Sequence, residues 1–226
     1  MIPFCYPNSS VLKNKLGIVN SDKLHQVERQ LTALRIQDLI QKPIRGSFDL
    51  QHLQDIHFYI FQDLYTWAGN LRTVNIAKGN MFCNVMFLEE QAKHIFNAIK
   101  MDNYLERMDR EMFVKRLAFH FSEINVLHPF REGNGRTQRE FIRELAIYNH
   151  YAIDFSNVSE NEMFDASVDS FLCKYEKMEA LFNMCVRKIK NESRRRPAGL
   201  LFMMTKDSAF RNLLYFPFSK LIIFKI

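Results

Sequence analysis

The 226-residue sequence is poor in the residues that interrupt regular structure, with seven glycines and six prolines. Such low contents argue against a loop-rich or all-β protein. Cysteine is also scarce: Cys5, Cys83, Cys173 and Cys185 lie far apart and form no CxxC pair. The sequence therefore indicates neither a zinc site nor a disulfide framework, and we expect buried, reduced thiols.

Segments that direct proteins into or across membranes are missing as well. The first residues, MIPFCYPNSS, contain no basic stretch followed by an apolar one, so they do not resemble a secretory signal. No window reaches the roughly 18 uncharged apolar residues that a membrane span requires. We expect a cytoplasmic protein without a membrane span.

Positive charge is concentrated in one short stretch. The formal net charge is +6, and residues 187–196 (RKIKNESRRR) hold +5 of it, which leaves +1 for everything else. A nearly neutral body does not indicate a nucleic-acid-binding protein, and nucleic acid is not an expected partner. The basic stretch itself is expected to be a solvated linker.

Bulky apolar side chains are abundant, with 21 Phe, 11 Met and 47% hydrophobic residues. This composition favours a mostly α-helical protein. Apolar residues recur at helical spacing, and the segments expected to be helices are about 21–42, 49–64, 88–101, 109–126, 134–148 and, as one helix or a pair, 160–190. Asn20 or Ser21 is the expected N-cap of the first helix, and Leu24, Val27, Leu31, Leu34 and Leu39 form its expected apolar face.

Between the second and third helices the pattern changes. Leu71, Val74 and Ile76 precede Lys78-Gly79-Asn80, and Phe82, Val85 and Phe87 follow. β-Formers on both sides of a Gly-Asn turn predict a short hairpin from about residue 71 to residue 87. The last thirty residues, 197–226, contain aromatic and β-branched runs that fit strands better than helices.

The segment from His128 to Arg139, HPFREGNGRTQR, is the most informative in the chain. Its glycines and Asn134 lie where a loop turns into a helix, so backbone N–H groups can converge on a phosphate. The two arginines, three residues apart, could neutralise further phosphate oxygens. Glu132 could hold Mg²⁺ together with the phosphates, and His128 suits a general base near neutral pH.

This segment resembles the Fic family motif HPFx(D/E)GNGRxxR and matches it at every specified position. VLKNKLGI near the start, DLYTWAGNLRTVNIAKG and the helix before the motif also resemble Fic proteins. The resemblance covers about residues 10–190. It implies the Fic fold, a bundle of about six to eight helices with a short β-hairpin flap over the active site. We therefore expect a Fic domain over residues 1–190, followed at 191–226 by a basic linker and a short apolar tail of unknown role.

The resemblance also implies a reaction: AMP is transferred from ATP, with Mg²⁺ as cofactor, to a Ser, Thr or Tyr hydroxyl of a target protein. His128 would deprotonate that hydroxyl and Glu132 would hold the metal. The expected phosphate ligands are Gly133, Asn134, Gly135, Arg136 and Arg139. Phe130, after Pro129, would anchor the loop in the core. The expected target-aligning flap consists of Ile76, Ala77, Lys78, Gly79 and Asn80.

Related Doc proteins carry Lys in place of the second glycine and act as kinases, so Gly135 favours nucleotidyl transfer. Two alternatives stay open: transfer of another moiety such as UMP or phosphocholine by the same fold, and a non-catalytic helical binding module with a basic tail. The identity of the target cannot be inferred from the sequence.

Many Fic enzymes are silenced by an (S/T)xxxE(G/N) helix. The one match here, Ser156–Asn161, lies soon after the motif, where a helix start with a capping Ser is the simpler interpretation. The resemblance thus favours a separate antitoxin-like inhibitor, with this chain as the toxin of a toxin–antitoxin pair. It also favours a bacterial cytoplasm, with delivery into a host cell left open.

Overall fold

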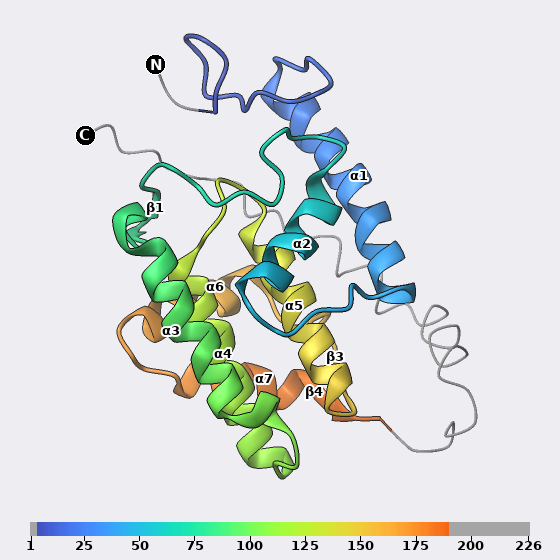
Figure 1. Cartoon of the computed structure of the whole chain (residues 1–226), viewed down its shortest axis with the longest axis vertical. Helices are drawn as coiled ribbons and strands as arrows, with labels where there is room; N and C mark the ends of the chain where they lie inside the picture. Colours follow the sequence, from blue (N-terminus) through green and yellow to red (C-terminus); the bar gives the residue numbers. More distant parts are fainter. Residues whose placement is uncertain (1–3, 190–226) are drawn as a thin grey trace.

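The computed structural model describes residues 4–189 of the chain (Figure 1). These residues form seven α-helices: α1 (Ser21–Gln41), α2 (Leu50–Phe61), α3 (Leu88–Met101), α4 (Arg110–Leu127), α5 (Asn134–Tyr148), α6 (Glu160–Phe171) and α7 (Glu176–Cys185). Two 3₁₀ turns, η1 (Val85–Phe87) and η2 (Asn103–Leu105), and four short strands complete the described part. The predicted mostly helical class, with its two-stranded hairpin, is confirmed.

Helices α4 and α5 form the centre of the bundle. Helix α4 packs against α3, α5 and α7, helix α5 packs against α2 as well, and α1 lies on the outer side of α2 (Figure 1). One continuous core joins them, and its largest fully buried aromatic side chains include Tyr65, Phe61, Phe113, Phe121, Phe130, Phe141 and Phe182. The phenylalanine-rich composition thus supplies the bulky side chains that fill the spaces between helices.

Side-chain caps set most of the helix starts. The carboxamide or carboxylate oxygens of Asn20, Asp49 and Asp109 accept hydrogen bonds from the third backbone N–H that follows, at 2.9 Å in each case. Ser159 caps α6 in a reciprocal pair with Glu162. Such a cap typically contributes about 1 kcal/mol. The Ser156–Asn161 segment therefore contains a helix start, as the sequence predicts.

The hairpin is much shorter than expected. Strands β1 (Ala77–Lys78) and β2 (Asn80–Met81) pair around Gly79, and Val85 to Phe87 form the turn η1 instead of a strand. Beyond this ladder the Phe82 N–H still donates to the Ile76 carbonyl, but the carbonyls of Val74 and Cys83 accept hydrogen bonds from the buried guanidinium of Arg72. The predicted strand residues 71–76 and 82–87 were therefore wrong.

A second two-stranded sheet was not predicted. Strand β3 (Tyr151–Ile153) pairs antiparallel with β4 (Val186–Lys188), so helical structure ends at Cys185 and not near Lys190. Arg110 at the start of α4 donates to the carbonyls of Asn183 and Val186, which fixes this end of the chain to the bundle. The predicted helix pair at 160–190 is confirmed apart from this last segment.

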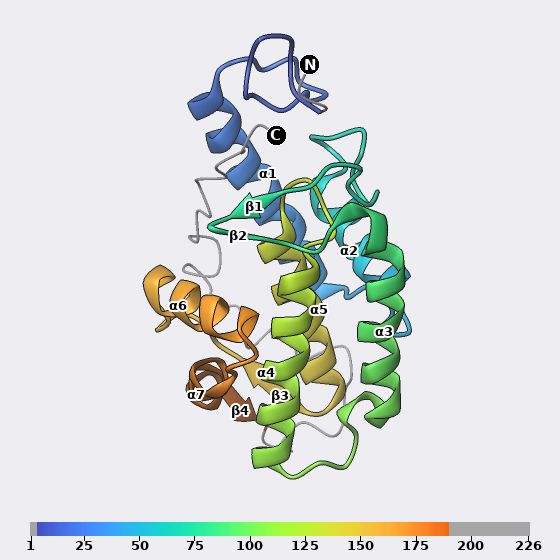
Figure 2. The same cartoon turned by 90° about the vertical axis from the view of Figure 1, so that its left-hand side faces the viewer.

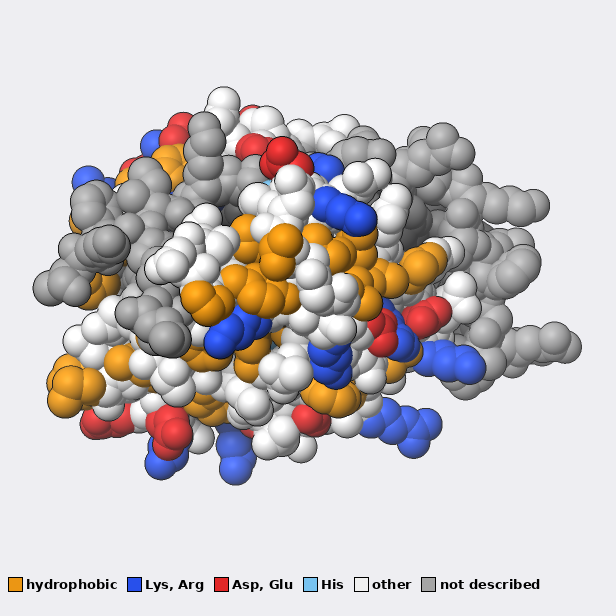
Figure 3. All heavy atoms as spheres, turned by 90° about the horizontal axis from the view of Figure 1, so that it is seen from above, with side chains coloured by type: hydrophobic (Ala, Val, Ile, Leu, Met, Phe, Trp, Pro, Cys, Tyr) orange, Lys and Arg blue, Asp and Glu red, His pale blue; other side chains and the backbone are white. Residues whose placement is uncertain are grey.

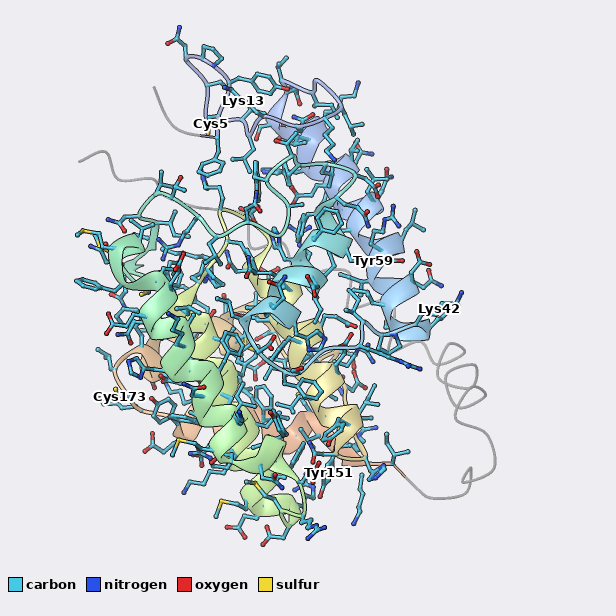
Figure 4. The ribbon with its side chains drawn as sticks, viewed as in Figure 1. Cys5, Lys13, Lys42, Tyr59, Tyr151 and Cys173 are labelled. Carbon is cyan, nitrogen blue, oxygen red and sulfur yellow. The ribbon has the colours of Figure 1, made fainter. Side chains whose placement is uncertain are left out.

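Two further expectations need correction. Leu34 is 61% exposed and so lies outside the buried face of α1, whereas the polar residues Glu28 and Thr32 are buried on it beside Leu24 and Leu39. Cys5 and Cys185 are buried as expected, but Cys83 is half-buried and Cys173 is exposed. Cys5 and Cys173 lie at distant points of the molecule in Figure 4, in keeping with the absence of a disulfide from the described residues.

Within residues 4–189, none of the helices has the length and apolar character needed to cross a membrane. The strand structure predicted for residues 197–226, and most of the basic stretch, lie outside the described residues.

The turn from α4 to α5 places both helix ends at one point (Figure 2). His128 ends α4 in a left-handed conformation, and Gly133, with φ +82°, precedes α5. A Cβ atom on Gly133 would lie 2.1 Å from Cζ of Phe61. Glycine is therefore required there for both conformation and space.

Substituting Gly133 by Ala should cost about 1–2 kcal/mol for the left-handed backbone and about 1–3 kcal/mol more for overpacking against Phe61. Gly79→Ala is a matched control, because Gly79 also has a positive φ of +77° but has open space around its Cα. Urea unfolding of both variants measures the difference. Equal losses of stability would contradict the proposed role of the Phe61 contact.

Candidate active site

A pocket lies where the hairpin, the α4–α5 turn and α6 meet. It encloses about 720 Å³ of empty space, its open mouth included. Its walls come from the hairpin (Lys78, Asn80, Phe82), the end of α4 (Asn125, His128), the start of α5 (Glu132, Asn134, Gly135, Gln138) and α6 (Phe164, Ser167, Val168, Phe171). Figure 2 shows β1 and β2 above the ends of α4 and α5, with α6 below them.

Hydrogen bonds to its carbonyl groups stabilise the turn between α4 and α5. Six of the seven carbonyl groups from Leu127 to Gly133 accept a hydrogen bond from a protein N–H or O–H. Their donors are Arg72, Asn134, His57 and Thr137. With its carbonyls turned into the protein, the segment directs the first N–H groups of α5 outward, where they are available to an anion.

Arg72 donates to more of these carbonyl groups than any other residue, and sequence reasoning missed it. Its guanidinium is buried and donates to the carbonyls of Val74, Cys83, Leu127 and His128. Its backbone N–H donates to the carbonyl of Pro129 at 2.9 Å. Arg72 thus fastens both sides of the hairpin to the turn that carries His128.

His57 supports the turn from the other side. Its Nδ1 accepts from the Gly69 N–H at 2.8 Å and its Nε2 donates to the Glu132 carbonyl at 3.0 Å. The ring stacks on Phe130 with centroids 3.8 Å apart, and Phe130 is fully buried. Burial lowers the pKa of His57 to about 3, so it stays neutral and keeps this arrangement of donor and acceptor.

His128 presents its imidazole to the pocket as a neutral base. Its Nδ1 lies 3.2 Å from the Asn125 carbonyl, which can only accept, so Nδ1 carries the hydrogen and Nε2 the lone pair. The ring stacks on Phe82 with centroids 3.7 Å apart. Burial lowers the pKa of His128 to about 3, against the effect of the Asn125 carbonyl and with help from the charges of Arg72 and Lys78.

Glu132, Asn134 and Gly135 line the pocket beside His128. The Asn134 side chain bonds both backbone groups of Phe130 at 2.8 Å, which closes the turn, and the Gly133 N–H donates to the Glu132 carboxylate at 2.9 Å. Burial and the charge of Glu28 raise the pKa of Glu132, while Arg136 opposes them. One carboxylate therefore faces the place where an anion would bind.

Arg136 is not among the pocket-lining residues, and its expected contact with phosphates stays a prediction. Its guanidinium lies 2.5 Å from Glu28 and 3.0 Å from the Thr32 hydroxyl, both on α1, and 3.9 Å from Glu132. It also lies over the Phe61 ring at 4.7 Å. Glu28 accepts a further hydrogen bond from Tyr65. Arg136 therefore links α1 to the turn through a buried ion pair.

Arg139 is buried on α5 and does not line the pocket either. Burial, with the charge of Arg136, lowers its pKa to about 10, and Glu160 at the start of α6 acts in the opposite direction. The two arginines therefore differ in surroundings, and the binding of phosphates expected of both stays a prediction.

The hairpin residues form one wall of the pocket. Ile76 is buried, Ala77 is half-buried, Gly79 and Asn80 are exposed, and Lys78 lies 5.7 Å over the Phe164 ring of α6. The Cys83 N–H donates to the Val126 carbonyl, so the hairpin base is tied to α4. Figure 3 looks down on this end of the molecule and shows hydrophobic side chains gathered across its middle, with Lys and Arg between them.

An anion-binding helix start with a neutral imidazole at its edge defines a site for group transfer from a phosphorylated substrate. The chain belongs to the Fic/DOC family, whose family model matches residues 47–146. The resemblance seen in the motif is thereby confirmed.

Curated relatives extend the similarity beyond the motif. "Protein adenylyltransferase VbhT" of Bartonella schoenbuchensis is 39% identical over 180 residues, which are 79% of this chain and 38% of VbhT. "Probable protein adenylyltransferase Fic" of Salmonella typhimurium is 34% identical over 190 residues, which are 83% of this chain and 94% of the relative. The chain therefore spans well under half of VbhT and nearly all of the Salmonella protein.

Solved structures agree. The N-terminal Fic domain of a VirB-translocated Bep effector from Bartonella quintana, solved with bound ADP, has a TM-score of 0.78 at 30% identity and covers 83% of this chain and 95% of that domain. The fold described above is thus the Fic fold.

The buried pair of Glu28 and Arg136 can be tested by a double-mutant cycle. Removing one partner, as in Glu28→Leu, should destabilise the protein by about 3–5 kcal/mol, because a charge and the Tyr65 hydroxyl lose their partner. Combining it with Arg136→Met should cost less than the sum of the single changes. Thr32→Val, which removes the hydroxyl's hydrogen bonds with Arg136 and with the Glu28 carbonyl but no charge, should cost about 1–3 kcal/mol. Additive losses in urea unfolding would show that the ion pair is not formed.

Proposed function

We propose that this protein transfers AMP from ATP to a hydroxyl side chain of a target protein. Family membership, together with near full-length similarity to a Salmonella relative named as an adenylyltransferase, makes it an enzyme of that class. The observation that carries the proposal is the position of His128, whose unprotonated Nε2 shares one pocket with the start of α5.

In the proposed reaction the hydroxyl oxygen attacks the α-phosphorus. A bond forms between these two atoms, the bond from the α-phosphorus to the oxygen bridging to the β-phosphorus breaks, and pyrophosphate leaves with the electron pair. Nε2 of His128 accepts the hydroxyl proton. A positioned general base typically contributes about 10²–10⁴-fold to a rate. Gly133, Asn134 and Gly135 are proposed to bind the phosphates through their backbone, and Gly135 leaves no side chain in their way.

The residues present fit a magnesium ion. Glu132 lines the pocket beside the proposed phosphates, and Mg²⁺ is commonly held by one or two carboxylates together with phosphate oxygens. Glu132 is therefore the proposed protein ligand, and the metal would neutralise charge on the phosphates. Arg136 and Arg139, which lie outside the pocket lining, are proposed to act on the more distal phosphates by their charge.

The hairpin is proposed to align the target. Lys78 and Asn80 of the hairpin line the pocket, Gly79 between them is exposed, and the backbone of an edge strand can pair with an extended segment. The Fic domain is proposed to extend over residues 1–190, with the remainder as an appended segment. The location proposed for this chain is the bacterial cytoplasm.

Replacing His128 by Ala should lower transfer of labelled AMP from ATP and Mg²⁺ to lysate proteins at least about 100-fold, because the base is lost. His94→Ala is the matched control, since His94 is exposed on α3. It should label as well as the parent chain. If His128→Ala retained full labelling, His128 would not be the base.

A finer role, as the toxin of a toxin–antitoxin pair, is also proposed. The (S/T)xxxE(G/N) match belongs to the start of α6, where Ser159 and Glu162 form the cap, so inhibition is proposed to come from a separate protein. Glu160 does act on Arg139 by its charge, which makes its own contribution testable.

Glu160→Gln should leave the labelling rate within about two-fold of the parent chain, because removing one exposed charge at a helix start changes little. Glu176→Gln on α7 is a control of the same chemistry, also exposed at a helix start. A rate increase confined to Glu160→Gln would show that the chain inhibits itself and that no separate inhibitor is needed.

A further inference from the structure

Gln138 has no role in the reaction proposed above, yet it lines the pocket. It lies four residues after Asn134 on α5 and therefore on the same face of the helix, about one turn further from the helix start. The side chain is only 4% exposed. A polar group in such a position needs partners.

The carboxamide of Gln138 is satisfied on one side only. Its Nε2 donates to Oδ1 of Asn125 at 3.1 Å, which orients the amide between α4 and α5. Its Oε1 is buried and accepts no hydrogen bond from the part of the chain that the structure describes. A buried acceptor without a donor is costly, so its presence in a binding pocket points to a donor on the ligand.

Part of the pocket wall is apolar. Phe164, Val168 and Phe171 of α6 border the same pocket as Gln138, and their side chains offer no competing donors or acceptors. An apolar wall in the same pocket as a buried, unpaired acceptor suits a flat heteroaromatic ring that carries an amino group at its edge.

We propose that Oε1 of Gln138 accepts a hydrogen bond from the exocyclic amino group of a 6-aminopurine nucleotide, and so selects adenine among the purines. The inference rests on the proposed nucleotide transfer and names a determinant of its specificity. Guanine and hypoxanthine carry an oxo group at the same ring position. Its oxygen and Oε1 of Gln138 are both hydrogen-bond acceptors, so they would repel each other. Purine without a substituent would leave Oε1 unpaired.

The experiment compares ATP with purine riboside 5′-triphosphate, which lacks only the amino group. Both are titrated calorimetrically, with Mg²⁺, into the full chain carrying His128→Ala, so that no transfer consumes them. ATP should bind about tenfold more tightly, the value of one ordinary hydrogen bond. Inosine 5′-triphosphate should bind at least as weakly as the unsubstituted purine. This comparison needs no change at Gln138.

Gln138→Met, of similar size and without the amide, should bring the ratio of the two dissociation constants to about one. Ser167→Ala is the matched pocket control, because the Ser167 hydroxyl donates to the Met163 carbonyl within α6. It should leave the tenfold ratio unchanged.

Three outcomes would overturn the proposal. Equal affinities of the parent chain for both triphosphates would show that the protein does not recognise the amino group. A tenfold ratio that persists in Gln138→Met would show that another group recognises the amino group, and that Gln138 serves only to orient Asn125 and His128. Absence of binding by every triphosphate would refute the nucleotide-transfer function itself, and the specificity inference would fall with it.

Discussion

The structure depends on one constraint: the turn between α4 and α5 must expose N–H groups while burying its carbonyls. Peptide carbonyls facing a protein interior need donors, and the segment's own helices cannot supply them at this point. Arg72, His57 and Asn134 supply them from three different elements. Because each donor bonds to a different part of the turn, its conformation is determined before any ligand arrives, and an anion would meet N–H groups already in place.

Burial of the same turn also determines the chemistry of His128. An exposed imidazole would be partly protonated near neutral pH, whereas low solvation and the nearby charges of Arg72 and Lys78 keep this one neutral. The Asn125 carbonyl then decides which nitrogen carries the hydrogen. Arg72 thus has two effects that arise from one position: its donors shape the turn, and its charge disfavours a second charge on the neighbouring ring.

Much of this could be predicted from the sequence, and the limits are instructive. Helix periodicity and the HPFREGNGR motif are local patterns, so the helices, the helix start at α5 and the pocket residues beside it were accessible. Arg72, His57 and Glu28 were not, because they act on partners 56 to 108 positions away. The leucine pattern of α1 locates Leu24 and Leu39 on the buried face, but for the same reason it misses Glu28 and Thr32, which contact Arg136.

The position of Arg136 changes how the charges of the site balance. Glu28 and Glu132 both lie near this guanidinium, and burial together with the charge of Glu28 raises the pKa of Glu132. Arg136 offsets that repulsion, so Glu132 can stay ionised and available to a cation. A residue that sequence reasoning assigns to the phosphates would therefore act first on the protein itself. Its pairing with α1 places the first helix of the chain in the electrostatic balance of a site built from α4 and α5.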